Sequence, residues 1–201
     1  MLEVEVGELA PHELWPAVQM LSRAFRDNPL PVAVFGQNPE RRRKALERYF
    51  STWVPTLGWI PLCARRNGWV TGLVGIAPPG RCRLGPWRFT RLALAVARGG
   101  GPRSVPRALT IASLWEKWDP AQGHWHLGPV GVEPSLQGMG IGSQMLERFC
   151  YYMDSLRALA YLETDKPENV RFYERFGFRV IGEEEALGIT HWFMAREPSS
   201  R

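Results

Sequence analysis

Long hydrophobic runs are absent from this chain of 201 residues. No apolar stretch approaches the ~18 residues that a membrane-spanning helix needs. The N-terminus, MLEVEVGEL, is acidic, whereas a secretory signal begins with basic residues and continues with apolar ones. We therefore expect no membrane association and place the protein in the cytoplasm.

Cysteine is scarce as well. The three cysteines, at positions 63, 82 and 150, are odd in number and show no C-x-x-C spacing. This usage suits a reducing compartment and argues against a structural zinc site. The four histidines, at 12, 124, 126 and 191, do not form a metal-binding helix motif. We expect no metal.

Acidic residues are missing from residues 81–107, which hold seven arginines, and the whole chain has a net charge of +5. One interpretation is an acidic partner, either a nucleic acid or an acidic substrate. The other is a solvated arginine-rich face, which is the commoner case. Nucleic-acid binding is not expected, because the segment lacks the interleaved aromatic residues and fold motifs of such proteins.

What is present fits one domain spanning residues 1–201, with an apolar content of 45%. Asn67-Gly68 is the strongest short signal for a β-hairpin, and a helical insertion is expected at about 81–122. The periodicity predicts strands over 3–6, 60–65, 69–77, 124–132, 158–163, 178–183 and 190–196, and helices from Pro11 and over 40–54, 89–97, 105–118, 141–156 and 169–176.

The most informative stretch is Val130–Phe149, VGVEPSLQGMGIGSQMLERF. A β-branched run ends at a proline turn, and glycines 138, 140 and 142 then open an amphipathic helix. Glycine lets the backbone turn tightly and approach a ligand closely. The first amides of a helix are unpaired and lie at the positive end of its dipole. The stretch therefore predicts a phosphate or pyrophosphate site.

Two better-known phosphate loops do not fit this stretch. A P-loop needs Gly-Lys-Ser/Thr after its glycines, and Gly142-Ser143-Gln144 supplies no lysine. A dinucleotide fingerprint has the spacing G-x-G-x-x-G near the start of a βαβ unit, whereas these glycines are spaced G-x-G-x-G far down the chain. The alternative is a helix start that binds nothing, but three alternating glycines would be costly there without a reason.

Two linked motifs carry a resemblance to a known family. Gln137-Gly138-Met139-Gly140-Ile141-Gly142 matches the Q/R-x-x-G-x-G/A motif of the GCN5-related N-acetyltransferases (GNAT), and Asn169–Phe178 resembles that family's N-x-x-F/L-Y-x-x-x-G-F signature. Both lie in the last two-fifths of the chain. Within the family, the order of W-x-L, VGV-x-P, the glycine loop, LET and N-x-x-FYER-x-GF is similar to the puromycin N-acetyltransferases.

This resemblance implies the GNAT fold, of the α/β (α+β) class: a single mixed, mostly antiparallel sheet with a bulged, splayed strand pair and flanking helices. Gly128-Pro129, inside the expected strand 124–132, agrees with it, because proline cannot donate to a ladder and marks an edge or a bulge. In the family the pantetheine arm of acetyl-CoA, the acyl-donor cosubstrate, lies in the gap beside the bulge. The 3′-phosphate of acetyl-CoA is then a further acidic partner for the arginine segment.

The resemblance also assigns cofactor-binding residues. Main-chain N–H groups of the glycine loop are expected to hold the pyrophosphate, and amides of the bulged strand are expected to contact the thioester and the pantetheine. The expected cofactor-binding residues are Val130, Gly131, Val132, Gln137, Gly138, Met139, Gly140, Ile141, Gly142, Ser143, Asn169 and Tyr173.

Tyr173 is the candidate general acid for the departing thiolate. It lies four residues after Asn169, hence on the same face of a helix. A tyrosine with an ordinary pKa of ~10 can protonate a thiolate at neutral pH, and the family's tyrosine at this position has that role. The alternative is a core aromatic residue like its neighbour Phe172.

The general base is left open among three residues. His126 titrates near neutrality and stands where some histone-acetylating relatives carry a glutamate, although the puromycin enzymes have phenylalanine there. Strand alternation puts His126 on the same side as Gly128 and Val130. Glu163 lies in the LET triplet, and His124 is the third candidate. A water chain with no side-chain base is the remaining alternative.

We therefore expect an acetyl-CoA-dependent N-acetyltransferase that acts on the primary amine of a small molecule, antibiotic-like amines included. The alternatives are an acetyltransferase of protein N-termini or lysines and a non-catalytic acyl-CoA-binding regulatory module. Tyr173 and Asn169 argue against the last, since binding alone would not need an acid. Residues 25–60 and 81–122 are expected to form the acceptor pocket, and the oligomeric state is left open between monomer and homodimer.

Overall fold

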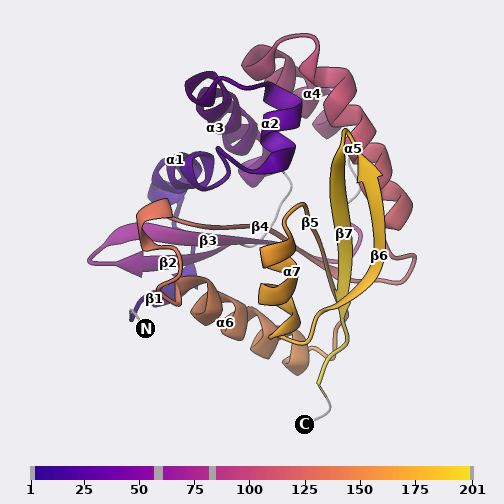
Figure 1. Ribbon diagram of the computed structural model, residues 1–201. Coiled ribbons are helices and arrows are strands. Elements are labelled where there is room, and N and C mark those ends of the chain that lie inside the picture. The colour runs from indigo at the N-terminus through magenta and orange to yellow at the C-terminus, as the bar shows by residue number, and fades with distance from the viewer. Residues whose placement is uncertain (1–2, 57–60, 82–84, 200–201) are drawn as a thin grey trace.

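In a computed structural model, which describes residues 3–56, 61–81 and 85–199, the chain folds around one mixed sheet (Figure 1). The described strands follow the order β1-β2-β3-β4-β5-β7-β6; β4 and β5 run parallel, and every other neighbouring pair is antiparallel. This confirms the expected fold class. The strands are β1 (Glu5–Glu8), β2 (Leu62–Arg66), β3 (Trp69–Ala77), β4 (Trp125–Val132), β5 (Ala160–Thr164), β6 (Arg179–Ala186) and β7 (Ile189–Arg196).

Helices cover both faces of the sheet (Figure 1). α6 and α7 pack on one face, whereas α1, α3 and α5 pack on the other. The helices are α1 (Leu14–Ala24), α2 (Pro29–Phe35), α3 (Pro39–Thr56), α4 (Pro86–Gly100), α5 (Ser104–Trp118), α6 (Ile141–Ser155) and α7 (Pro167–Glu174), with short 3₁₀ turns η1 (Pro11–Glu13) and η2 (Pro134–Leu136).

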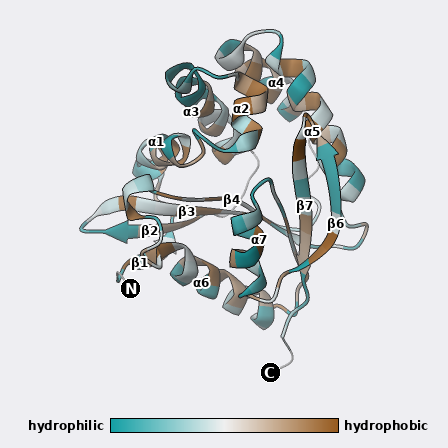
Figure 2. Ribbon diagram, in the orientation of Figure 1, coloured by the Kyte–Doolittle hydropathy of each residue, from teal (hydrophilic) through white to brown (hydrophobic). Residues whose placement is uncertain are grey.

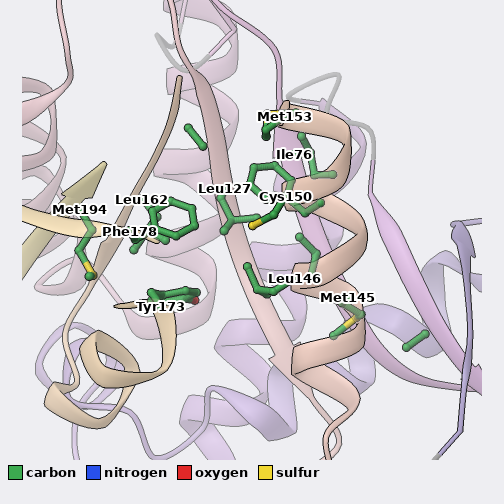
Figure 3. Packing of buried hydrophobic residues seen from close by; sticks show 14 of the residues in the cluster. Ile76, Leu127, Met145, Leu146, Cys150, Met153, Leu162, Tyr173, Phe178 and Met194 are labelled. Atoms are coloured by element: carbon green, nitrogen blue, oxygen red, sulfur yellow. The ribbon is translucent and has the colours of Figure 1, made fainter. Parts of the chain in front are cut away.

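The main core lies between the sheet and α6 (Figure 3). Met145, Phe149 and Met153 recur at intervals of four and are fully buried there, each contributing about 1.5–3 kcal/mol relative to an exposed position. Separate clusters lie on the opposite face, beneath α1 and α3 and beneath α5. Figure 2 shows the hydrophilic outer side of α3, as the alternation of apolar and charged residues predicts.

The expected bulge lies in β4. Val130 pairs with Val74 of β3 and Leu127 pairs with Ile76, so one residue of β3 stands opposite both Gly128 and Pro129. The Gly128-Pro129 peptide bond is cis. On its other side β4 pairs with β5 through two residue pairs, Trp125 with Ala160 and His126 with Tyr161, before the strands separate. The sheet is therefore parted between β4 and β5.

Local sequence signals for turns and caps are confirmed. Asn67 and Gly68 have φ values of 51° and 77° between β2 and β3, as a two-residue hairpin turn requires. Asn38 caps α3 by accepting the N–H of Arg41 at 2.9 Å. The predicted start of the β2 strand at residue 60 lies outside the described residues.

Two helices differ from the expectation. α1 ends at Ala24, and Pro29 then opens α2, a helix that was not expected, because proline is well suited to the first turn of a helix. α4 continues through Gly99 and Gly100, which were expected to form a loop. A Cβ atom on Gly99 would lie 2.8 Å from Cα of Ala45, so glycine is needed there for close packing of α4 on α3.

Candidate active site

The glycine loop connects β4 to α6. Gly140 is the N-cap of α6 in the left-handed conformation, with a φ of 88°, which glycine adopts without strain. The first helical bond joins the N–H of Gln144 to O of Gly140 at 3.2 Å. The amides of Ile141, Gly142 and Ser143 therefore precede the hydrogen-bonded helix and are available to an anion.

Two contacts hold this loop in place. Nε2 of Gln137 donates to O of Val132 at 3.1 Å, which joins the loop to the end of β4. A Cβ atom on Gly142 would lie 3.3 Å from Cζ of Phe172, so this glycine lets α7 pack against the start of α6. The expected pyrophosphate residues thus form one continuous loop beside α7, and they fit an anionic cofactor.

The edge of β4 after the bulge faces the parted region. Val130, Gly131 and Val132 pair with β3, whereas the described β5 residues that follow Tyr161 pair with β7 alone. The β5-facing backbone groups of this segment therefore have no ladder partner in β5. This is the geometry that the resemblance implies for pantetheine and thioester contacts.

Tyr173 combines a buried ring with a hydroxyl group at this gap. Its ring contacts those of Phe172 and Phe178 edge to face, at centroid distances of 5.3 and 5.8 Å, and belongs to the α6 cluster. Figure 3 shows its oxygen pointing toward β4. Burial raises the pKa of Tyr173, which keeps the hydroxyl protonated at neutral pH. Its role as an acid stays a prediction.

Asn169 ties α7 to the end of β5. Its Nδ2 donates to Oγ1 of Thr164 at 3.1 Å. Asn169 and Tyr173 lie one helical turn apart on α7, as expected. This contact fixes the position of α7, and hence of Tyr173, relative to the parted strands.

His126 and Glu163, two separate candidates for the base, form a pair. Nε2 of His126 lies 2.9 Å from Oε2 of Glu163, and their side chains are 13% and 5% exposed. The register places His126 beside Tyr161 on neighbouring strands, and their rings meet edge to face. His124, the third candidate, instead has Nε2 3.0 Å from Oδ1 of Asp119.

Side chains alternate between the two faces of a strand, and the bulge in β4 shifts this alternation. The side of the sheet on which His126 lies was predicted without that shift. Val130 packs into the α6 cluster, whereas His126 contacts Tyr161, which lies in the cluster beneath α5. The prediction that His126 and Val130 share a side is therefore wrong, because the extra residue shifts the two-residue period. Tyr173 and the His126–Glu163 pair lie on opposite faces of the sheet, beside the same gap.

Tyr49 and Asp165 were not predicted from the sequence. Burial, together with the nearby Glu163 carboxylate, raises the pKa of Tyr49 on α3. Oδ2 of Asp165 accepts the N–H of Leu30 at 2.7 Å, which joins α2 to the loop after β5. No local motif marks either residue, since both contacts cross between segments far apart in the sequence.

The arginine segment lies away from the glycine loop. α4 and α5 are on the opposite side of the sheet from α6 (Figure 1), so a contact with the 3′-phosphate of a cofactor bound at α6 is not supported. Arg91, Arg98, Arg103 and Arg107 are exposed, and Nη1 of Arg107 donates to O of Ala33 at 3.1 Å. This favours the interpretation of a solvated face.

The acetyltransferase (GNAT) family model matches residues 35–178. A structure from Corynebacterium glutamicum described as histone acetyltransferase HPA2 and related acetyltransferase is 17% identical, with a TM-score of 0.72 over 100% of this chain and 99% of that one. A GNAT acetyltransferase from Brucella melitensis in complex with acetyl-CoA is 19% identical (TM-score 0.53; 98% and 90% covered). An agmatine N-acetyltransferase is 16% identical (TM-score 0.56; 98% and 100% covered).

The family match covers every part of the candidate site. It includes the bulged β4, the glycine loop, α6 and α7, and acetyl-CoA, which the Brucella structure contains, is the acyl donor that this loop and gap fit. No helix in the described part of the chain is long and apolar enough to cross a membrane. The chain belongs to the GNAT family of acetyltransferases.

Proposed function

We propose that the protein transfers the acetyl group of acetyl-CoA to the primary amine of a small molecule, antibiotic-like amines included. The observation that carries the proposal is the gap between β4 and β5, with Tyr173 on one face of the sheet and the His126–Glu163 pair on the other. The site thus offers a proton acceptor for the amine and a proton donor for the departing thiolate, the two groups that acyl transfer can use.

Acetyl-CoA supplies an activated acetyl group as a thioester. The amides of Ile141, Gly142 and Ser143 bind its pyrophosphate, and the open edge of β4 orients the thioester and offers N–H groups to its carbonyl oxygen. The His126–Glu163 pair takes the proton released when the amine nitrogen forms the new amide bond. The Tyr173 hydroxyl donates a proton to the sulfur as its bond to the acetyl carbon breaks.

Helices cover the face of the sheet on which Glu163 lies, and this favours a small acceptor over a protein. α2 is fastened to the end of β5 through Leu30 and Asp165, and α5 is fastened to α2 through Arg107 and Ala33. These helices pack over the side on which Glu163 lies. The similarity to the puromycin N-acetyltransferases in the motif order supports the same choice, while the structural relatives carry names of both histone and small-amine acetyltransferases.

A panel of amine acceptors with acetyl-CoA tests the proposal, following the release of free thiol. We expect turnover with small primary amines and little with peptides that present a free N-terminus or a lysine. A preference for peptides would favour the protein acetyltransferase. Tight binding of acetyl-CoA with no turnover on any acceptor would instead favour a regulatory acyl-CoA-binding module.

Glu163→Gln tests the proposed proton acceptor, because it keeps the size of the side chain while removing the carboxylate beside His126. We expect turnover to fall by about 10²-fold or more, with little change in acetyl-CoA affinity. Glu174→Gln, on the exposed side of α7, is the control for loss of a charge. Unchanged turnover in Glu163→Gln would remove the pair from the mechanism.

A further inference from the structure

A cluster of potential metal ligands lies at the start of β4, next to the end of α5. Asp119, His124 and His126 each present one ligand atom, and the three atoms lie within 4.8 Å of one another. His126 also belongs to the proposed active site, whereas Asp119 and His124 have no part in the proposed reaction. The cluster was not expected, because the sequence spacing D-x-x-x-x-H-x-H does not match a helical metal motif.

The geometry of the first two ligands already resembles a coordination sphere. Oδ1 of Asp119 lies 3.0 Å from Nε2 of His124. Two ligands of a tetrahedral zinc ion, each at about 2.0–2.1 Å from the metal, are about 3.3 Å apart. The third ligand atom, on His126, lies within 4.8 Å of the other two. Such an ion would keep a fourth position for water.

The outer partners of both histidines are those of metal-bound imidazoles. Nδ1 of His124 lies 3.0 Å from O of Gln122, and Nε2 of His126 lies 2.9 Å from Oε2 of Glu163. A histidine that binds a metal through one nitrogen usually donates its other N–H to a carbonyl or a carboxylate, which fixes the tautomer and the ring. In the tautomers that donate these N–H groups, the lone pairs of the neutral rings lie on Nε2 of His124 and Nδ1 of His126.

The three side chains of the cluster are mostly, but not completely, buried. The side chains of His124, Asp119 and His126 are 6%, 13% and 13% exposed. A bound ion would be largely shielded from water, which strengthens its attraction to the Asp119 carboxylate. Two imidazoles and one carboxylate suit zinc and its neighbours in the first transition series better than magnesium or calcium, which prefer oxygen ligands.

We propose that Asp119, His124 and His126 form a site for a divalent first-row transition metal, with Zn²⁺ as the probe. Bound Zn²⁺ would occupy the His126 lone pair and thereby withdraw this residue from proton transfer, so the ion would inhibit acetylation. This consequence rests on the proposed function; the site itself does not.

Direct binding tests the site without reference to activity. Tag-free protein carrying Cys82→Ser is titrated with Zn²⁺ by calorimetry, and Co²⁺ is followed by its visible absorption. Burial raises the pKa of the thiols of Cys63 and Cys150 to about 11, so these cysteines compete weakly as ligands. We expect one ion per chain and an affinity at least ~10-fold weaker in Asp119→Asn and in His124→Gln.

His12→Gln is the matched control, because His12 is exposed and distant in sequence from the cluster, and its Zn²⁺ affinity should equal that of the parent. Circular dichroism confirms that each variant is folded, and two separate ligand variants are measured, so that one failure of folding does not decide the result. Absence of stoichiometric binding, or binding that survives both ligand substitutions, would overturn the site.

Inhibition supplies the second measurement. Asp119→Asn should acetylate amines like the parent in the absence of metal and should need at least ~10-fold more Zn²⁺ for the same inhibition. Equal inhibition of both proteins would overturn the link between this site and activity. Stoichiometric binding that is lost in Asp119→Asn but leaves turnover intact would uphold the site and contradict the proton-transfer role of His126.

Discussion

The hydroxyl group of Tyr173 belongs to a residue that is otherwise part of the core. The residue is 6% exposed and its ring packs against those of Phe172 and Phe178, so the motif's aromatic character is explained by packing alone. The oxygen, however, points toward β4 (Figure 3). The two interpretations of the sequence, core aromatic and acid, are therefore compatible, and substitution of the single oxygen atom separates them.

Tyr173→Phe should keep the packing and lose the proton donor. We expect turnover to fall at least ~10-fold, because general-acid catalysis is typically worth ~10²–10⁴-fold in rate, while the dissociation constant of acetyl-CoA stays nearly constant. Steady-state kinetics and calorimetry measure the two quantities. Tyr152→Phe, on an exposed position of α6, is the control. A parallel loss of affinity and turnover would mean that the hydroxyl holds the cofactor instead.

At the scale of elements, the start of α6 depends on a backbone conformation that few residues adopt. Gly140 has a φ of 88°, which strains any residue with a Cβ atom. Gly140→Val should therefore distort the loop and weaken acetyl-CoA binding at least ~10-fold, or ~1.4 kcal/mol. Gly188→Val, in the β6–β7 turn at a φ of 72°, imposes a similar strain away from the loop. Unchanged affinity in Gly140→Val would contradict the loop assignment.

An ion pair joins η1 to β2 and responds to acid. Oε1 and Oε2 of Glu13 accept from Arg65 at 2.6 and 2.5 Å, and this hydrogen bonding lowers the pKa of Glu13 from 4.5 to about 2. Because the folded pKa lies below the unfolded one, the pair stabilises the fold fully above pH 4.5, and this contribution is lost as the pH falls toward 2.

Glu13→Gln should expose that dependence. A shift of this size corresponds to on the order of 3 kcal/mol at neutral pH, so the variant should be less stable than the parent by that order at pH 7 and nearly equal to it near pH 2. Urea unfolding at several pH values measures the difference. Glu147→Gln, exposed on α6, should show a small difference throughout. A difference in unfolding free energy that does not decrease in acid would contradict the proposed effect of the Glu13–Arg65 ion pair.

Elements with strong local signals were predictable from the sequence, and contacts between distant segments were not. The Asn67-Gly68 turn, the Asn38 cap and the bulge at Gly128-Pro129 each follow from the conformational limits of one or two residues. α2 was missed because proline can both end one helix and start the next. The pairing of His126 with Glu163, and the proximity of Tyr49, arise from strand register and helix packing, which no local pattern records.

At the scale of the whole molecule, the parted strands divide the sheet into two portions. β1 to β4 form one continuous ladder, β5 to β7 form another, and the described strands join across two residue pairs, Trp125 with Ala160 and His126 with Tyr161. The strand pairing that joins the two portions of the sheet is therefore very short. The hydrophobic clusters on the two faces of the sheet carry the rest of the connection.

A cofactor arm lying in the gap beyond these two residue pairs would act as the missing strand between the two portions. Acetyl-CoA should then stiffen the sheet across its width and slow amide hydrogen exchange in Val130–Val132 and in the first turn of α6, with little effect in the β2–β3 hairpin. Hydrogen exchange followed by mass spectrometry measures this, and at 100 times the dissociation constant the ligand should add about 2.7 kcal/mol of stability. Protection confined to the α6 turn would place the arm elsewhere. The part of the sheet in which neighbouring strands make the fewest hydrogen bonds would thus be bridged by the bound cofactor.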